Sequence, residues 1–260
     1  TKASGKLEKT TGKLSSMQES GDFSQLESLI AGDTDSISSF LSAPVSLKTT
    51  EVYPIENYGS AMAPFYSTLS IWIGGIVLVA MLKVTVSKNR LDGLKNVKLH
   101  QMYLGRYLIF LIVGLLQSSL ICLGDLFYLG IQCKHPFLFV LAGWIVYVNI
   151  IYTLTVSFGD IGKAISVVLL VVQVAGTGGT FPIEVAPGFF RAVYPLLPFT
   201  HSMAAMREAV GGVYGMDYWM DLGKLGVFLI VSLVVGLVLR RPIIRMNDEF
   251  TEKLEETKLI

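Results

Sequence analysis

The fold of this chain depends on one segment, Phe181-Pro182-Ile183-Glu184-Val185-Ala186-Pro187. It separates two apolar runs, Lys163–Gly179 and Leu222–Leu239, and a helical pattern from Ser202 to Val210 follows it. Each proline inside a helix removes a backbone hydrogen bond, so this part of the chain does not cross a bilayer as one helix. Irregular backbone at membrane depth is tolerated where protein buries it or where it lines a cavity. We therefore predict a re-entrant or interfacial helical hairpin over 181–212.

The composition is that of a membrane protein. The 260 residues are 52% hydrophobic and 16% charged, whereas a soluble domain carries about 25% charged residues. The apolar residues are gathered in blocks, as expected for an all-α membrane protein. The two cysteines, Cys122 inside an apolar block and Cys133 beyond its end, do not suggest a disulfide framework. The net charge of +1 gives no reason to expect nucleic-acid binding.

Five apolar blocks are long enough to cross a hydrocarbon core of about 30 Å. They predict transmembrane helices at about 65–82, 107–128, 137–157, 163–180 and 222–239. These helices belong to a membrane domain over 53–245. Residues 1–52 carry short helical patterns and are expected to be the end of an extracellular helical stalk or ectodomain, and 246–260 a cytoplasmic tail.

The lysines and arginines between the blocks predict the orientation, because they accumulate in cytoplasmic loops. Twelve lie in 83–106, 158–163 and the tail from Arg240, against four on the opposite side when the N-terminal segment is left out of the count. We therefore expect a multi-pass protein of the cell membrane with an extracellular N-terminal segment, an extracellular hairpin and a cytoplasmic C-terminus.

The first cytoplasmic loop contains an amphipathic pattern over Arg90–Met102. Apolar and basic residues alternate there at helical spacing, which predicts a short helix along the membrane surface. Its candidate coupling residues are Arg90, Leu91, Leu94, Lys95 and Lys98. They either dock a cytoplasmic partner or hold anionic lipid headgroups.

Two sequence patterns resemble known membrane proteins. The first is Gly178-x-x-Phe181-Pro182 followed by Pro187, Pro195 or Pro198, and Arg207; the second is Tyr58-Gly59-x-x-Met62-x-Pro64-Phe65 with Leu69-x-Ile71-Trp72-Ile73-Gly74. The first resembles the membrane domain of type-two ABC exporters. The second is similar to the YhgE/Pip family of Gram-positive surface proteins, which includes a phage infection protein and a type VII secretion accessory protein.

This resemblance, over about 52–245, implies a six-helix exporter-type domain. A sixth transmembrane helix and most of an ectodomain would lie upstream, so we expect the chain to be a piece of a longer protein from a Gram-positive bacterium. The lipid bilayer surrounds such a domain. The partners implied are a cytoplasmic ATPase, a second copy in a homodimer, and phage or secretion-machine proteins. No cofactor is implied.

Polar side chains inside the apolar blocks are candidates for lining a translocation path. Such groups are costly in lipid and usually face protein or water. The candidates are Gln117, Asn149 and Gln173. The alternative is that they form hydrogen bonds between helices, worth about 0.6 kcal/mol each on average.

The hairpin carries a second set of candidates, for a gate at the outer mouth. The set comprises Phe181, Pro182, Glu184, Pro187 and Arg207. Glu184 and Arg207 either form an ion pair that holds the gate or extend separately to water.

No pattern in the chain indicates an enzyme. The run Gly159-x-x-Gly162-Lys163-Ala164 differs from a phosphate-binding loop, because Ala164 stands where Ser or Thr would bind Mg²⁺. The three histidines lie on different sides of the membrane in the predicted topology, so they do not form one metal site; they are His100, His135 and His201. Two functions stay open: a permease-like subunit of an ABC-type exporter or export machine, and a surface protein whose helices only anchor an ectodomain for assembly, adhesion or phage attachment.

Overall fold

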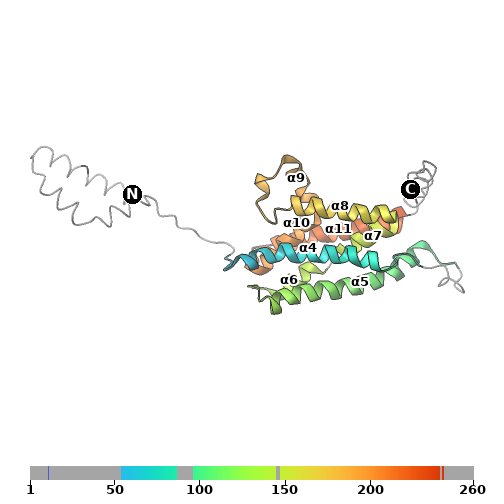
Figure 1. Cartoon of the computed structure of the whole chain (residues 1–260), viewed down its shortest axis with the longest axis horizontal. Coiled ribbons are helices and arrows are strands. Elements are labelled where there is room, and N and C mark those ends of the chain that lie inside the picture. The colour runs from blue at the N-terminus through green and yellow to red at the C-terminus, as the bar shows by residue number, and fades with distance from the viewer. Residues whose placement is uncertain (1–10, 12–53, 87–95, 145–146, 241, 243–260) are drawn as a thin grey trace, which may run out of the picture. The chain divides into compact units, whose positions relative to one another are not determined.

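The computed structural model describes residues 11, 54–86, 96–144, 147–240 and 242. All regular structure in this part of the chain is helical, and no strand occurs in it. Figure 1 shows the long helices side by side along one direction, with the short helix α9 projecting at one end. The prediction of an all-α membrane protein is confirmed.

Four helical stretches in the described residues are long and apolar enough to cross a membrane. They are α4 (Tyr58–Met81), α5 with the π turn η2 (Leu99–Leu123 and Gly124–Tyr128), α6 with α7 (Pro136–Gly143 and Tyr147–Phe158), and α11 with the π turn η5 (Asp217–Val234 and Val235–Leu239). Each overlaps a predicted transmembrane helix. The remaining prediction, 163–180, corresponds to α8 (Asp160–Gly176), whose 17 residues are about 26 Å long and lie at the lower limit for crossing.

Two helices begin earlier than the apolar blocks predict, because polar residues cap them. The side chain of Asn57 accepts a hydrogen bond from the backbone N–H of Ser60 at 2.8 Å, which starts α4 before the expected residue 65. At α5, the Gln101 side chain accepts from the backbone N–H of Lys98 at 2.9 Å. The helix therefore starts at Leu99 rather than at 107.

The third predicted helix, 137–157, is described as two helices rather than one. Trp144 is the C-cap of α6, α7 begins at Tyr147, and residues 145–146 lie outside the described part of the chain.

The segment 181–212 is not one continuous helix, as its prolines predict. It comprises η3 (Ile183–Val185), α9 (Gly188–Val193), η4 (Tyr194–Leu196) and α10 (Pro198–Gly211). The predicted helix 202–210 is extended backwards to Pro198, since proline is well suited to the first helical position. It ends at the glycine pair, where Gly212 has a φ of 120°. With 14 residues, α10 is about 21 Å long and too short to cross a bilayer.

The short helix α10 is nevertheless enclosed by the bundle. It packs against α11, α4 and α6, and nearly all of its side chains are buried. By contrast, only 22% of the apolar window of α5 with η2 and 17% of that of α11 with η5 are buried, against 61% for α4. The bundle thus encloses α4 and α10 to a greater extent, while α5 and α11 have exposed apolar side chains.

Trp72 of α4 lies at the centre of an aromatic core. Its ring makes edge contacts with Tyr147 of α7 at 5.4 Å and with Phe199 of α10 at 5.5 Å between centroids. Its indole N–H donates to the carbonyl of Ser166 on α8 at 3.1 Å. One fully buried side chain therefore joins four helices.

Candidate functional site

A polar network crosses the middle of the bundle at Asn149 of α7. Its Oδ1 accepts from the Tyr103 hydroxyl at 3.5 Å, and its Nδ2 donates to the carbonyl of Leu229 at 3.4 Å and to Ser232 of α11. The Tyr103 hydroxyl also lies 2.7 Å from the Thr153 hydroxyl. Asn149 is 1% exposed and uses both ends of its amide. Its contacts are those of the second alternative, hydrogen bonding between helices.

Gln117 lies at a different contact, between α5 and α4. A Cβ placed on Gly74 would fall 1.2 Å from Gln117 Nε2, so the glutamine side chain occupies the space that this glycine leaves. Gln117 is half-buried there and does not line the cavity described next.

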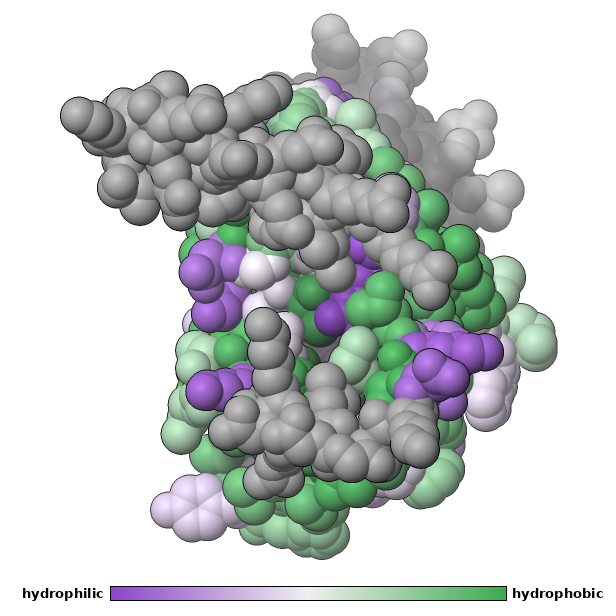
Figure 2. Space-filling view, turned by 90° about the vertical axis from the view of Figure 1, so that its right-hand side faces the viewer, coloured by the Kyte–Doolittle hydropathy of each residue, from purple (hydrophilic) through white to green (hydrophobic). Residues whose placement is uncertain are grey.

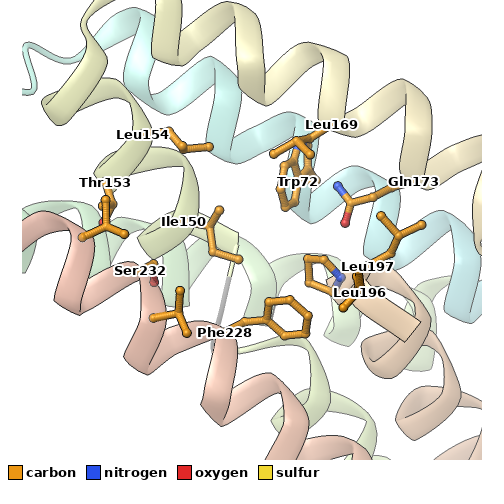
Figure 3. A pocket seen from close by; sticks show the side chains of 13 residues that line it. Trp72, Ile150, Thr153, Leu154, Leu169, Gln173, Leu196, Leu197, Phe228 and Ser232 are labelled. Atoms are coloured by element: carbon orange, nitrogen blue, oxygen red, sulfur yellow. The ribbon is translucent and has the colours of Figure 1, made fainter. Parts of the chain in front are cut away.

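Gln173 of α8 borders a cavity of about 230 Å³. The cavity lies between α7, α8, α11 and the segment that leads into α10, with Trp72 at its inner side (Figure 3). Gln173 is 1% exposed, and its Oε1 accepts from the backbone N–H of Phe199 at 3.3 Å. Its Nε2 has no hydrogen-bond partner among the described residues. Gln117 therefore lies apart from the other two path residues, whereas Ser232 and Thr153 of the Asn149 network also line the cavity beside Gln173.

The predicted gate residues do not gather into one cluster either. Arg207 of α10 donates to the carbonyls of Gly178 and Gly179 at 3.2 and 3.4 Å, and so ties α10 to the turn after α8. Burial lowers the pKa of its guanidinium from 12.5, while Tyr194 opposes this shift. Glu184 is exposed, and none of the ion pairs between described residues joins it to Arg207. Phe181, Pro182 and Pro187 are also exposed.

A hydrogen-bonded histidine links α10 to α11. His201 of α10 is 5% exposed; its Nδ1 lies 2.9 Å from the Asp221 carboxylate and its Nε2 lies 3.0 Å from the Pro195 carbonyl. Lys224 donates to the same Asp221 oxygen at 3.0 Å. No sequence pattern predicted this cluster. Asp221 and Lys224, an acidic and a basic residue three positions apart near the start of an apolar helix, were the available signal, but nothing in the sequence pairs them with His201.

The predicted coupling helix over 90–102 requires a correction. Asn96 has a φ of 58°, Lys98 is extended as the N-cap of α5, and Met102 already belongs to that helix. A helix does not run through Asn96 in this conformation, because a left-handed residue ends the helical path. Arg90, Leu91, Leu94 and Lys95 lie outside the described residues.

The end of the bundle where α4 ends and α5 begins carries basic residues. Figure 2 looks onto this end and shows hydrophilic side chains among apolar ones, next to uncertain residues drawn in grey. Lys83 and Lys98 are exposed, and Arg106 donates to the Lys83 carbonyl at 2.6 Å. Lys163 of α8 forms a 2.9 Å ion pair with Asp160.

Among the residues that the structure describes, no group of three His, Cys, Asp or Glu side chains could hold a metal ion. The described part of the chain is a bundle of packed helices with polar contacts between them, a lateral cavity beside Gln173 and a second pocket beside Arg207.

Comparisons with known proteins agree with this arrangement. The family model described as "ABC-2 family transporter protein" matches residues 7–238. The "Uncharacterized protein YhgE" of Bacillus subtilis (strain 168) is 26% identical over 193 residues, which cover 72% of this chain and 24% of that protein. The chain thus spans about a quarter of the length of this relative. No solved structure matches.

Proposed function

The chain belongs to the ABC-2 family of transporter proteins, and from this premise we propose that it acts as the permease-like membrane subunit of an exporter. In this proposal an ATPase on a separate polypeptide binds the basic end of the bundle. ATP binding and hydrolysis then move the helices so that a path opens alternately toward each side of the cell membrane.

The observation that carries the proposal is α10, a buried helix that does not cross. A protein that only anchors an ectodomain needs one transmembrane helix and no enclosed, polar, interrupted segment. Several hydrogen bonds hold α10, among them those from Arg207 to the turn after α8, between His201 and Asp221, and from Cys133 Sγ to the Ala209 carbonyl at 3.4 Å. These noncovalent contacts join α10 to several neighbouring segments, so a movement of those segments can reposition it during a cycle.

The proposed orientation places the basic end in the cytoplasm and α9 outside the cell. It is supported by the excess of lysine and arginine at that end. Single cysteines at Lys98 and Phe189, in a chain whose native cysteines are replaced, test it. An impermeant maleimide applied to intact cells should label position 189 and not position 98, and the reverse pattern would refute the orientation.

The loop before α5 is the proposed docking element for the ATPase. It connects α4 to α5, so displacing it moves both helices, and Lys98 is exposed at its end. Electrostatic attraction to anionic lipid, about 1 kcal/mol per basic residue, is the competing explanation.

The decisive experiment purifies the full-length protein, with its neighbours cross-linked, from native membranes. We expect an ATPase in near-stoichiometric amount, and a change in the maleimide reactivity of a cysteine at the 63% exposed Tyr214 when ATP and vanadate are added. If neither occurs, the alternative function holds, in which the helices anchor an ectodomain for assembly, adhesion or phage attachment.

A further inference from the structure

We propose that the cavity beside Gln173 binds one acyl chain of a membrane lipid, and that the ester carbonyl of this lipid accepts a hydrogen bond from Gln173 Nε2. This inference concerns binding alone and does not depend on the proposed transport function.

The size and chemistry of the cavity suit a hydrocarbon chain. Its volume is about 230 Å³, whereas an apolar cavity of about 150 Å³ already holds benzene. Apolar side chains from α4, α7, α8, α11 and the segment before α10 form most of its wall: Trp72, Ile150, Leu154, Leu169, Leu197 and Phe228. Water gains few hydrogen bonds in such a space, so an apolar ligand is favoured.

The orientation of the Gln173 amide specifies what the ligand must offer. The backbone N–H of Phe199 is a donor, so the amide atom facing it must be the oxygen. The Nε2 group is then a buried donor without a partner among the described residues, and Figure 3 shows the amide end of Gln173 beside the cavity. A buried donor left without an acceptor is unfavourable, so a ligand with an acceptor at this point is stabilised. A hydrocarbon alone would not satisfy it, whereas a lipid ester would.

The opening of the cavity identifies lipid as the source of such a chain. Leu196 and Val231, which line the cavity, are 68% and 54% exposed, while Trp72 is fully buried. The neighbouring faces of α8 and α11 are exposed and apolar; they include Val167, Val168, Val171, Val227, Ile230 and Val234. In a membrane these faces contact hydrocarbon, so a lipid reaches the opening sideways.

The dimensions place the ester at a suitable depth. Gln173 lies three residues before the end of α8, so it is roughly 5 Å from that end, near the border of the hydrocarbon core. From Phe228 to Val235 the cavity follows α11 over roughly 10 Å, from the middle of this helical stretch toward the end of the bundle where α7 ends. The acyl chain therefore enters with its ester near Gln173 and its tail directed toward Leu154.

Fluorescence quenching of Trp72 tests this arrangement. The full-length protein, with every tryptophan except Trp72 replaced by phenylalanine, Trp144 and Trp219 included, is placed in vesicles of phosphatidylcholine with brominated acyl chains. We expect bromine to quench Trp72 although this residue is fully buried from the surface. Leu154→Phe, which fills the inner part of the cavity, should abolish the quenching.

A competition experiment tests the hydrogen bond. Unbrominated ester-linked phosphatidylcholine should restore Trp72 fluorescence at roughly two- to tenfold lower concentration than its ether-linked analogue, the preference that one net hydrogen bond gives. Gln173→Leu should remove this preference. Gln117→Leu changes a half-buried amide away from the cavity and should keep it.

Three results would overturn the proposal. A second single-tryptophan protein that retains the 49% exposed Trp219 serves as the positive control. If bromine quenches Trp219 but not Trp72, another protein segment or a second copy covers the cavity and no lipid enters. Quenching that persists in Leu154→Phe shows access by another route. An ester preference that survives Gln173→Leu, with the helical circular dichroism spectrum unchanged, excludes the hydrogen bond.

Discussion

Two amides of equal burial, Asn149 of α7 and Gln173 of α8, have different surroundings. Each is 1% exposed. Asn149 donates and accepts hydrogen bonds that join α7 to α5 and α11. Gln173 uses only its oxygen, on the backbone of α10, and leaves its nitrogen beside a cavity.

The difference separates a structural polar group from one available to a ligand. In an apolar bundle both amides look alike in the sequence, since each interrupts a hydrophobic run. A fully bonded amide stabilises one arrangement of the helices, whereas an amide with a free donor favours a bound acceptor. Four pairs of substitutions test this contrast.

The largest loss of stability is expected at Trp72, which lines the Gln173 cavity and packs against Tyr147 of α7, the helix that carries Asn149. Trp72→Ala should lower the free energy of unfolding by about 3–5 kcal/mol, because it removes a fully buried ring and leaves a cavity. Trp72→Phe keeps much of the packing and should lose only about 1 kcal/mol with the bond to Ser166. Steric-trap unfolding in bicelles measures both, and equal losses would contradict the central role of the indole packing.

A smaller loss is expected at His201, which holds the outer wall of the Gln173 cavity and does not touch Asn149. His201→Phe keeps a ring but removes the bonds to Asp221 and Pro195, so it should cost about 1.5–3 kcal/mol. Lys224→Met, at the 55% exposed partner of the same carboxylate, should cost about 0–1 kcal/mol. Thermal unfolding followed by circular dichroism compares the stabilities of the two variants. Similar losses would show that the hydrogen bonds of His201 stabilise the protein no more than the exposed ion pair of Lys224 does.

The spacing between the two helices that carry the amides depends on Gly162. A Cβ at this position would lie 2.0 Å from the Leu154 carbonyl oxygen, so Gly162→Ala should force α8 away from α7 at a cost of about 1–3 kcal/mol. Gly105→Ala on α5, where a Cβ meets nothing within 4 Å, is the matched control and should be neutral or stabilising. Stability of Gly162→Ala equal to that of Gly105→Ala would exclude the close contact.

The smallest changes in the free energy of unfolding are expected when each of the two amides is replaced by leucine. Asn149→Leu should cost about 0.6–1.7 kcal/mol, the range for hydrogen bonds between membrane helices. Gln173→Leu loses one weak bond and relieves an unpaired donor, so it should change the free energy of unfolding by less than about 0.5 kcal/mol. Unfolding in bicelles of matched lipid composition measures both losses of stability. A larger loss for Gln173→Leu than for Asn149→Leu would show that Gln173, and not Asn149, is the structural amide.

The long apolar helices could be predicted from composition, but several of their ends could not. The apolar blocks located α4, α5 and α11, because about 20 apolar residues are needed to cross a bilayer. The ends depend on single polar contacts such as Asn57 with Ser60 and on conformations such as that of Asn96. The helix predicted over 90–102 is wrong at Asn96 and Lys98 for this reason, and its last residues, Leu99 to Met102, belong to α5. The proline-rich hairpin was predicted to be interrupted, and it is, but Pro198 begins a helix rather than preceding one.

The sequence by itself determined that this chain builds a helical membrane domain, which residues interrupt its apolar helices, and that 181–212 does not cross as one helix, because hydrophobicity and proline chemistry act locally. The tertiary structure decided what each polar residue contacts. Asn149 meets α5 and α11, Gln173 meets a cavity, and His201 meets Asp221 twenty residues later in the chain. These outcomes depend on the rotation of each helix about its axis and on the packing of α10 inside the bundle. Several helices together set these positions, and no single stretch of sequence specifies them.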